Sequence, residues 1–110
     1  MHKYHAKQTS LDGHKFDSIA ESRRYAELKL LQQAGTITGL SVHPIFELQP
    51  KFTTKAGERI RAINYEADFT YHENGQQVVE DVKGMILATA KLKMKMFQYR
   101  YPKLQLIIIQ

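Results

Sequence analysis

Apolar residues recur at intervals of three and four positions in two segments of the chain, which is the spacing of one helix face. The first segment runs from Ser18 to Ala34, and Gly35 follows it at a position that commonly ends a helix. The second segment runs from about Thr89 to Tyr101 and stops before Pro102. We therefore predict a helix in each segment.

Four further segments have the sequence of β-strands. Their residues alternate between apolar and polar types or form short apolar runs. The strands are expected at Ile45 to Gln49, Arg59 to Tyr71, Gln77 to Lys83 and Leu104 to Ile109. Thr53 to Gly57 is expected to be the loop between the first two, and Asn74-Gly75 is typical of a two-residue hairpin turn before the third. The last strand is apolar enough to be buried on both faces.

The order helix, three strands, helix, strand predicts an α/β fold with a mixed sheet, because a helical crossover joins strands that run parallel. A chain of 110 residues is long enough for a single domain. Residues 1–16 contain Lys3, Lys7 and Lys15 around Asp12-Gly13, a turn signal. We interpret them as a basic arm or hairpin, with an ordinary terminus of scattered charge as the alternative.

The composition excludes several classes of site. The chain contains no cysteine, which rules out disulfides, zinc-thiolate sites, iron-sulfur clusters and cysteine nucleophiles. Apolar runs such as Leu106 to Ile109 are far shorter than the roughly 20 residues needed to span a bilayer. The segment from Met1 to His5 lacks the apolar stretch of a signal peptide. We therefore expect a cytoplasmic protein that does not contact membranes.

The charges are unevenly distributed. Sixteen Lys and Arg against eleven Asp and Glu give a net charge of +5, which favours a polyanionic partner. Positions 66–81 contain no Lys or Arg but hold five of the eleven acids, namely Glu66, Asp68, Glu73, Glu80 and Asp81. Positions 82–110 contain six cations and no acid. An acidic segment inside a basic chain indicates a specific role for its carboxylates.

A two-residue turn at Asn74-Gly75 fixes the register of the predicted hairpin. It places Asp68 opposite Asp81. The same register places Glu66 opposite Lys83, with all four side chains on one face. Opposed carboxylates repel each other, so a cation is expected between them, and hard oxygen ligands at this separation suit Mg²⁺ or Mn²⁺. The alternative is a solvated hairpin whose acids keep a sheet edge soluble.

Asp68 followed by Asp81-Val82-Lys83 resembles the signature of PD-(D/E)XK nucleases, and the predicted order of elements resembles the core of that superfamily. Ala67 stands where the signature has proline. The chain is also similar to a small phage- and prophage-borne family of uncharacterised, Holliday junction resolvase-like proteins. The similarity is carried by Tyr4-His5-Ala6-Lys7, Phe16-Asp17-Ser18, Tyr65-Glu66-Ala67-Asp68-Phe69 and Asp81-Val82-Lys83-Gly84.

The resemblance implies a restriction-endonuclease-like αβββαβ core with a mixed sheet flanked by helices. It implies that Asp68, Asp81 and the backbone carbonyl of Val82 bind Mg²⁺, for which Mn²⁺ can substitute. Lys83 would position or activate the attacking water. The family also uses a glutamate on the first helix, and Glu21 is the candidate for catalysis and metal binding. Alternatively, Glu21 completes a capping box at the start of that helix.

We therefore expect a metal-dependent DNA endonuclease acting on branched DNA such as a Holliday junction, in DNA recombination within a bacterial host. One alternative is a nicking or flap-type DNA nuclease. Another is a noncatalytic nucleic-acid-binding module whose acidic hairpin is structural. The residues expected to contact DNA phosphates are Lys91 and Lys95 on the second helix and Lys3, Lys7 and Lys15 in the basic arm.

The second predicted helix, residues 89–101, has two apolar stripes. One stripe consists of Leu92, Met96 and Tyr99, and the other of Ala90, Met94, Phe97 and Tyr101. One stripe must cover the sheet. The second either packs on the first helix or forms a homodimer contact.

Two histidine patterns are interpreted as noncatalytic. His72-Glu73-Asn74 resembles part of a histidine-asparagine nuclease motif, but the turn requires Asn74 and no partner histidine follows. His43 precedes Pro44 at the start of a predicted strand, and we interpret it as structural rather than as a metal ligand.

Overall fold

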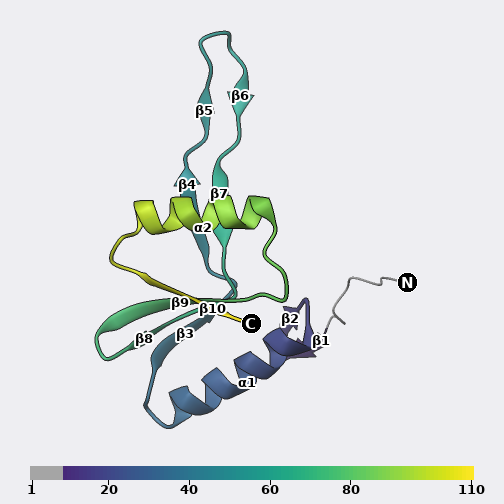
Figure 1. Cartoon of the computed structure of the whole chain (residues 1–110), viewed down its shortest axis with the longest axis vertical. Helices are drawn as coiled ribbons and strands as arrows, with labels where there is room; N and C mark the ends of the chain where they lie inside the picture. Colours follow the sequence, from purple (N-terminus) through teal and green to yellow (C-terminus); the bar gives the residue numbers. More distant parts are fainter. Residues whose placement is uncertain (1–8) are drawn as a thin grey trace.

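The central sheet has four strands in the order β10, β9, β8, β3 (Figure 1). The computed structural model describes residues 9–110. Strands β3 (Thr38–Val42), β8 (Phe69–Glu73) and β9 (Gln76–Val82) are antiparallel neighbours, and β10 (Gln105–Ile109) runs parallel to β9. The fold is therefore mixed α/β with a mixed sheet. The predicted parallel pairing across the second helix is confirmed.

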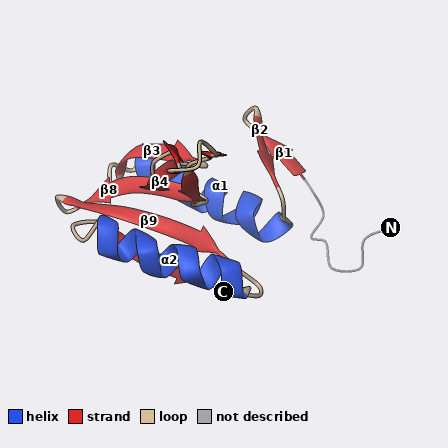
Figure 2. Ribbon diagram, turned by 90° about the horizontal axis from the view of Figure 1, so that it is seen from above, coloured by secondary structure: helices blue, strands red, loops and turns tan. Residues whose placement is uncertain are grey.

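Two helices cover opposite faces of this sheet (Figure 2). They are α1 (Ile19–Gln33) and α2 (Ala88–Arg100), and each end lies within one residue of its predicted position. Because successive residues of a strand face opposite sides, Val78 contributes to one core and Val79 to the other. The core beside α1 consists of Phe16, Tyr25, Leu28, Ile37, Phe69, Tyr71 and Val78. The core beside α2 consists of Leu48, Tyr65, Ala67, Val79, Met94 and Phe97.

Local sequence sets both ends of α1. Ser18 is extended, and its Oγ accepts the N–H of Glu21 at 3.0 Å, which satisfies one free donor of the first turn. Gly35 follows the helix with a φ of +81°, a conformation that glycine adopts without strain, and its N–H donates to the Gln32 carbonyl at 3.0 Å. Helix α2 has no side-chain cap at its start and ends before Pro102.

The β8–β9 hairpin has the register that its turn residues predict. Both residues of Asn74-Gly75 have positive φ angles, as a type I′ turn requires. The strands then pair without interruption as far as Phe69 and Glu80. The next residues beyond this last pair of the two strands are Asp68 and Asp81. The two acids therefore face each other, as predicted, just beyond the end of the ladder.

The prediction of one strand from Arg59 to Tyr71 is wrong. The segment contains the three strands β6 (Arg59–Ile60), β7 (Ile63–Glu66) and β8. Strand β7 leaves the central sheet and pairs with β4 (Ile45–Gln49), so Glu66 lies opposite Ile45 and not opposite Lys83. Alternation shows which residues share a face but not which strand is the partner, and it therefore does not reveal a change of partner.

A long two-stranded ribbon projects from the body of the molecule (Figure 1). Strands β4 and β7 form its inner part, and β5 (Phe52–Thr53) and β6 continue it outward. The predicted loop from Thr53 to Gly57 forms its tip apart from Thr53, which is the last residue of β5. At the tip the N–H of Thr54 donates to the Glu58 carbonyl at 2.8 Å. We call residues 45–66 the β-ribbon. The molecule measures 53 Å in its longest dimension and 24 Å in its shortest.

Two strands of the sheet differ from expectation. Strand β3 was not predicted, because its sequence does not alternate regularly and Gly39 interrupts it with a φ of +65°. Strand β10 is at the edge of the sheet, and Leu106 to Ile109 are only half-buried. The predicted burial of this strand on both faces is therefore wrong. An edge strand has a neighbour on one side only, and two helices cannot enclose it fully.

The described part of the N-terminal segment forms the predicted hairpin. Strands β1 (Thr9–Leu11) and β2 (His14–Phe16) pair around Asp12-Gly13. Lys15 is exposed on β2. Lys3 and Lys7, predicted to contact DNA, lie outside the described residues. Within residues 9–110, neither helix has the length and apolar sequence required to cross a membrane.

Candidate metal centre

Four segments far apart in the sequence meet at one end of the central sheet. Helix α1 contributes Glu21, the β3–β4 connection contributes His43, and the β7–β8 connection contributes Asp68. The end of β9 contributes Asp81, and Lys83 follows it. One ligand atom from each of Glu21, His43 and Asp68 lies within 4.8 Å of the other two. We call these five residues the acidic site.

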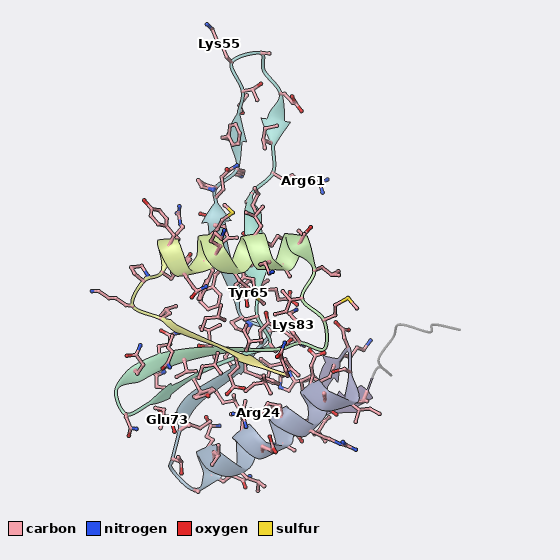
Figure 3. All side chains as sticks on the ribbon, viewed as in Figure 1. Arg24, Lys55, Arg61, Tyr65, Glu73 and Lys83 are labelled. Carbon is pink, nitrogen blue, oxygen red and sulfur yellow. The ribbon has the colours of Figure 1, made fainter. Side chains whose placement is uncertain are left out.

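Asp81 is completely buried. Its Oδ2 accepts the hydroxyl of Tyr65 at 2.5 Å, and the Lys83 ammonium lies 3.4 Å from its Oδ1. Figure 3 labels Tyr65, which donates this hydrogen bond, and Lys83, which forms the ion pair. The Lys83 contact is an ion pair without hydrogen-bond geometry, so Oδ1 is a buried oxygen with no hydrogen-bond donor among the described residues. Such an atom is costly unless a further cation or donor satisfies it.

Asp68 is held by the strand opposite. Its Oδ2 accepts the backbone N–H of Val82 at 2.6 Å, and its own N–H donates to the Glu80 carbonyl at 3.0 Å. One bond uses the side chain of Asp68 and the other its backbone, and together they continue the hairpin after the regular ladder has ended. Val82, expected to provide its carbonyl oxygen, therefore touches Asp68 through its N–H.

Glu21 lies one turn inside α1 on the same buried face as Tyr25 and Leu28, as the sequence predicts. Its carboxylate is 7% exposed and accepts the Ser18 hydroxyl at 3.3 Å. Its backbone N–H donates to that hydroxyl. The capping interaction and the position beside Asp68 therefore occur together, and neither of the two interpretations of Glu21 excludes the other.

Burial changes the acidity of the two aspartates. It raises the pKa of Asp68 to about 6, and a hydrogen bond with Glu21 acts in the same direction. Burial also raises the pKa of Asp81 to about 6, together with a hydrogen bond to Asp68, while Tyr65 and Lys83 oppose the shift. Burial raises the pKa of Tyr65 well above its usual range, so its hydroxyl remains a donor to Asp81. The surrounding protein groups do not compensate the negative charge of these two carboxylates, because the pKa values rise instead of falling.

The structure brings His43 into the acidic site, which the sequence interpretation did not anticipate. Its φ is +55°, an uncommon backbone conformation for a residue other than glycine, and its N–H donates to the Asp68 carbonyl at 2.9 Å. The register of the β-ribbon offers a signal, because Ile45 lies opposite Glu66 and the positions two residues outward are His43 and Asp68. The register of β3 with β8 gives the same result, because Val42 lies opposite Phe69 and the next positions are His43 and Asp68. Both signals depend on knowing which strands pair.

The donor set fits a divalent cation. Two carboxylates, those of Glu21 and Asp68, converge with the imidazole of His43. Beside Asp68, Asp81 has a buried oxygen without a hydrogen-bond donor among residues 9–110. Carboxylate oxygens suit Mg²⁺ and Mn²⁺, and an imidazole shifts the preference toward the transition metal.

Glu80 is a buried acid that lies opposite Phe69, on the other face of β9 from Asp81. Its two oxygens accept hydrogen bonds from Arg24 at 2.8 and 2.7 Å, and the Tyr71 hydroxyl also donates to it. Figure 3 labels Arg24 on α1. The bidentate pair fixes α1 on the sheet, and it raises the pKa of Arg24 beyond its usual range.

The two lysines of α2 that are predicted to contact DNA lie on one surface. Lys91 and Lys95 are exposed and line a groove between α2 and β10. The other residues of this groove are Met94, Gln98, Leu106 and Ile108. Glu66 and Glu73, the remaining acids of the acidic segment, are exposed and half-buried respectively and take no part in the acidic site.

The apolar stripes of α2 have different environments. Met94 and Phe97 are buried and Ala90 and Tyr101 are half-buried, so their stripe covers the core. Leu92 and Tyr99 of the other stripe are 57% and 89% exposed. The second stripe does not pack on α1, which lies on the opposite face of the sheet.

One comparison with known proteins gives a match. A family model described as "Protein of unknown function (DUF1064)" matches residues 1–110. No curated protein and no solved structure matches the chain.

Proposed function

The chain belongs to the DUF1064 family of proteins of unknown function, and we propose that it is a metal-dependent DNA endonuclease that hydrolyses phosphodiester bonds. The observation that carries the proposal is the buried, unsatisfied Oδ1 of Asp81 beside Asp68 and Lys83. A structural acid would be expected to have both oxygens hydrogen-bonded by the protein, as Glu80 has. An acid that binds a metal needs an oxygen that is free to coordinate the ion.

The residues that would hold the cation are Asp68, Asp81, Glu21 and the Val82 carbonyl, with His43 as a further ligand. When bound, Mg²⁺ or Mn²⁺ supplies a Lewis acid for a phosphoryl oxygen and lowers the pKa of a coordinated water. Tyr65 holds Asp81 in one orientation through its hydroxyl. This fixed hydrogen bond prevents the carboxylate from rotating away from Asp68.

Lys83 provides the cationic group of the proposed mechanism. Its ammonium lies 3.4 Å from Asp81 and its side chain is 30% exposed, so it can reach both the carboxylate and a phosphate from solvent. There it would position the attacking water and stabilise the negative charge that develops on the phosphate. Arg24 and Glu80 have a positioning role, because their ion pair joins the helix that carries Glu21 to the strand that carries Asp81.

The order of elements supports a restriction-endonuclease-like core. If the β-ribbon is treated as an insertion, the chain runs α1, β3, β8, β9, α2, β10, which is the αβββαβ order implied by the resemblance. The first of the three central strands is then β3 and not the predicted strand at Ile45 to Gln49. Helices on both faces of a mixed sheet agree with this assignment.

We propose branched DNA such as a Holliday junction as the substrate, on the resemblance to resolvase-like proteins. The net charge of +5 supports a DNA partner of any structure. A nicking or flap-type nuclease would use the same residues on a different substrate.

Cleavage assays test the proposal. Linear, single-stranded, flap and four-way-junction DNA are incubated with the protein, with and without Mg²⁺ or Mn²⁺. We expect metal-dependent cleavage of the junction, its loss in Asp81→Asn, and its retention in Glu66→Gln. Glu66 is a matched control because it is an exposed acid two residues from Asp68. Absence of cleavage of every substrate with either metal would contradict the proposal and favour a noncatalytic DNA-binding module.

A further inference from the structure

The β-ribbon starts at the acidic site. Its two strands leave the body next to His43 and Asp68, whose backbones are joined by the hydrogen bond from the His43 N–H to the Asp68 carbonyl. The N–H of Ala67 donates to the Pro44 carbonyl at 3.0 Å and continues the same pairing. The orientation of the ribbon is therefore fixed by residues that form the candidate metal centre (Figure 1).

The outer half of the β-ribbon is basic. Residues 50–62 contain one acid, Glu58, and the four cations Lys51, Lys55, Arg59 and Arg61. All four cations are exposed, and none forms an ion pair with any of the described residues 9–110. Figure 3 labels Lys55 at the tip and Arg61 lower on the ribbon, both pointing away from the body. The positive charge of this segment is therefore not used within the structure.

The register separates the charges from the apolar residues. Phe52 pairs with Ile60 and Thr53 pairs with Arg59. Because side chains alternate between the two faces, Lys51 and Arg61 lie on the same face as Arg59. The opposite face carries Phe52, Ile60 and Glu58. One face of the outer ribbon is thus polar and cationic over its whole length.

We propose that this cationic face binds the phosphates of double-stranded DNA on one side of the cleavage point. This inference rests on the proposed endonuclease function and specifies how the substrate is held. A two-stranded ribbon fits a DNA major groove about 12 Å wide. The cations of this face lie level with positions six to eight residues beyond Ile45, which at about 3.3 Å per residue is roughly 20 to 26 Å along the strand. With 3.4 Å between successive base pairs, the contacted phosphates lie about 6 to 8 base pairs from the scissile bond.

The first test is the salt dependence of DNA binding, measured by fluorescence anisotropy on labelled duplex and junction DNA without divalent metal. The variant is the triple substitution Lys51→Gln, Arg59→Gln, Arg61→Gln. We expect the slope of log K against log salt to fall by about 2.7, because each lost phosphate contact reduces it by about 0.9. The control neutralises Arg23, Arg100 and Lys103, which are equally exposed but lie outside the β-ribbon. We expect the control to keep the slope of the unmodified protein.

The second test varies the length of duplex beside the cleavage point or junction. We expect the unmodified protein to lose affinity when the duplex is shortened below about 6 base pairs, because the outer phosphates are then missing. The triple variant is expected to bind long and short duplexes equally.

The two proposals fail in different ways. If the triple variant binds with the unmodified salt slope and the unmodified length dependence, the β-ribbon inference is wrong, whereas cleavage by the unmodified protein still supports the endonuclease. If no DNA is cleaved with Mg²⁺ or Mn²⁺, the endonuclease proposal is wrong, and the metal-free binding data still decide the ribbon. If the unmodified protein binds no DNA at low salt, the ribbon inference is overturned directly.

Discussion

Glu80 and Asp81 are consecutive residues of β9, both are completely buried, and they face opposite sides of the sheet. Glu80 meets the guanidinium of Arg24 in a bidentate contact. Asp81 meets Asp68, another acid, and keeps one oxygen without a hydrogen-bond donor among residues 9–110. Two acids of equal burial on one strand therefore differ in whether hydrogen-bond donors of the protein satisfy both of their oxygens. This difference separates a structural carboxylate from a candidate metal ligand.

The two acids should respond in opposite ways to loss of charge. Glu80→Gln removes the buried charge that Arg24 pairs with and leaves this guanidinium only the exposed Glu27, and we expect a loss of stability of about 3 kcal/mol. Asp81→Asn removes the repulsion with Asp68, and we expect equal or greater stability than the unmodified protein without metal. Thermal melting in a chelating buffer measures both. Equal destabilisation by the two substitutions would make Asp81 a structural residue.

The sequence predicts the hairpin and with it half of the acidic site. Asn74-Gly75 permits only a tight turn, the turn fixes the register, and the register brings Asp68 to Asp81. Each step depends on neighbouring residues only. The helix that carries Glu21 is predicted for the same reason, because its apolar spacing and its cap are local features.

The β-ribbon and His43 are not predictable by the same reasoning. The alternation from Arg59 to Tyr71 is the same whether the chain stays in one sheet or changes partner at Ala67. The pairing of β4 with β7 depends on contacts between residues about 20 positions apart, as in the pair of Ile45 with Glu66. His43 lies between β3 and β4, and the registers of these strands with β8 and β7 both place it opposite Asp68. The sequence pattern reveals neither pairing, so it does not bring His43 to the site.

The stability of the metal-free protein should fall as pH rises from about 4 to about 6. The pKa values of Asp68 and Asp81 are raised to about 6 in the folded state, whereas an unfolded aspartate titrates near 3.9. Between these values the folded protein holds protons that the unfolded chain has released, so raising the pH favours unfolding. Glu21, His43 and Lys83 are the other ionisable groups of the site.

Denaturant titrations in a chelating buffer at several pH values measure this dependence. We expect a decrease through about pH 6 and a weaker dependence above it. Asp81→Asn should flatten the decrease because one of the two titrating carboxyls is absent. If the stability of the unmodified protein instead rises between pH 4 and pH 6, the folded protein stabilises the ionised form of the two aspartates, and this prediction is wrong.

Substitution of Lys91 and Lys95 by alanine should weaken DNA binding. Both side chains are exposed beside the groove between α2 and β10. If each contacts one phosphate, the slope of log K against log salt falls by about one for each lysine. Anisotropy measurements without divalent metal determine the slope. An unchanged slope would assign both lysines to the solvated surface of the helix.

The exposed stripe of α2 tests the homodimer hypothesis. Leu92 and Tyr99 lie on this stripe and are largely exposed. We expect a dimer in sedimentation at micromolar concentration and a monomer after Leu92→Glu. Leu30→Glu is a matched control, because Leu30 is 65% exposed on α1, on the opposite face of the sheet. A monomer in the unmodified protein, with and without DNA, would contradict the hypothesis.

The response to metal connects stability with function at Asp81. A ligand that binds only the folded state stabilises it by about 2.7 kcal/mol at a hundredfold excess over its dissociation constant. We expect the unmodified protein to gain this amount from Mg²⁺ or Mn²⁺, and Asp81→Asn to gain much less, because one ligand is lost. Glu66→Gln should respond as the unmodified protein does. If Asp81→Asn binds junction DNA with unchanged affinity but does not cleave it, Asp81 acts in the chemical step. If all three proteins respond equally to the metal, the acidic site is not a metal centre, and its buried carboxylates need another explanation.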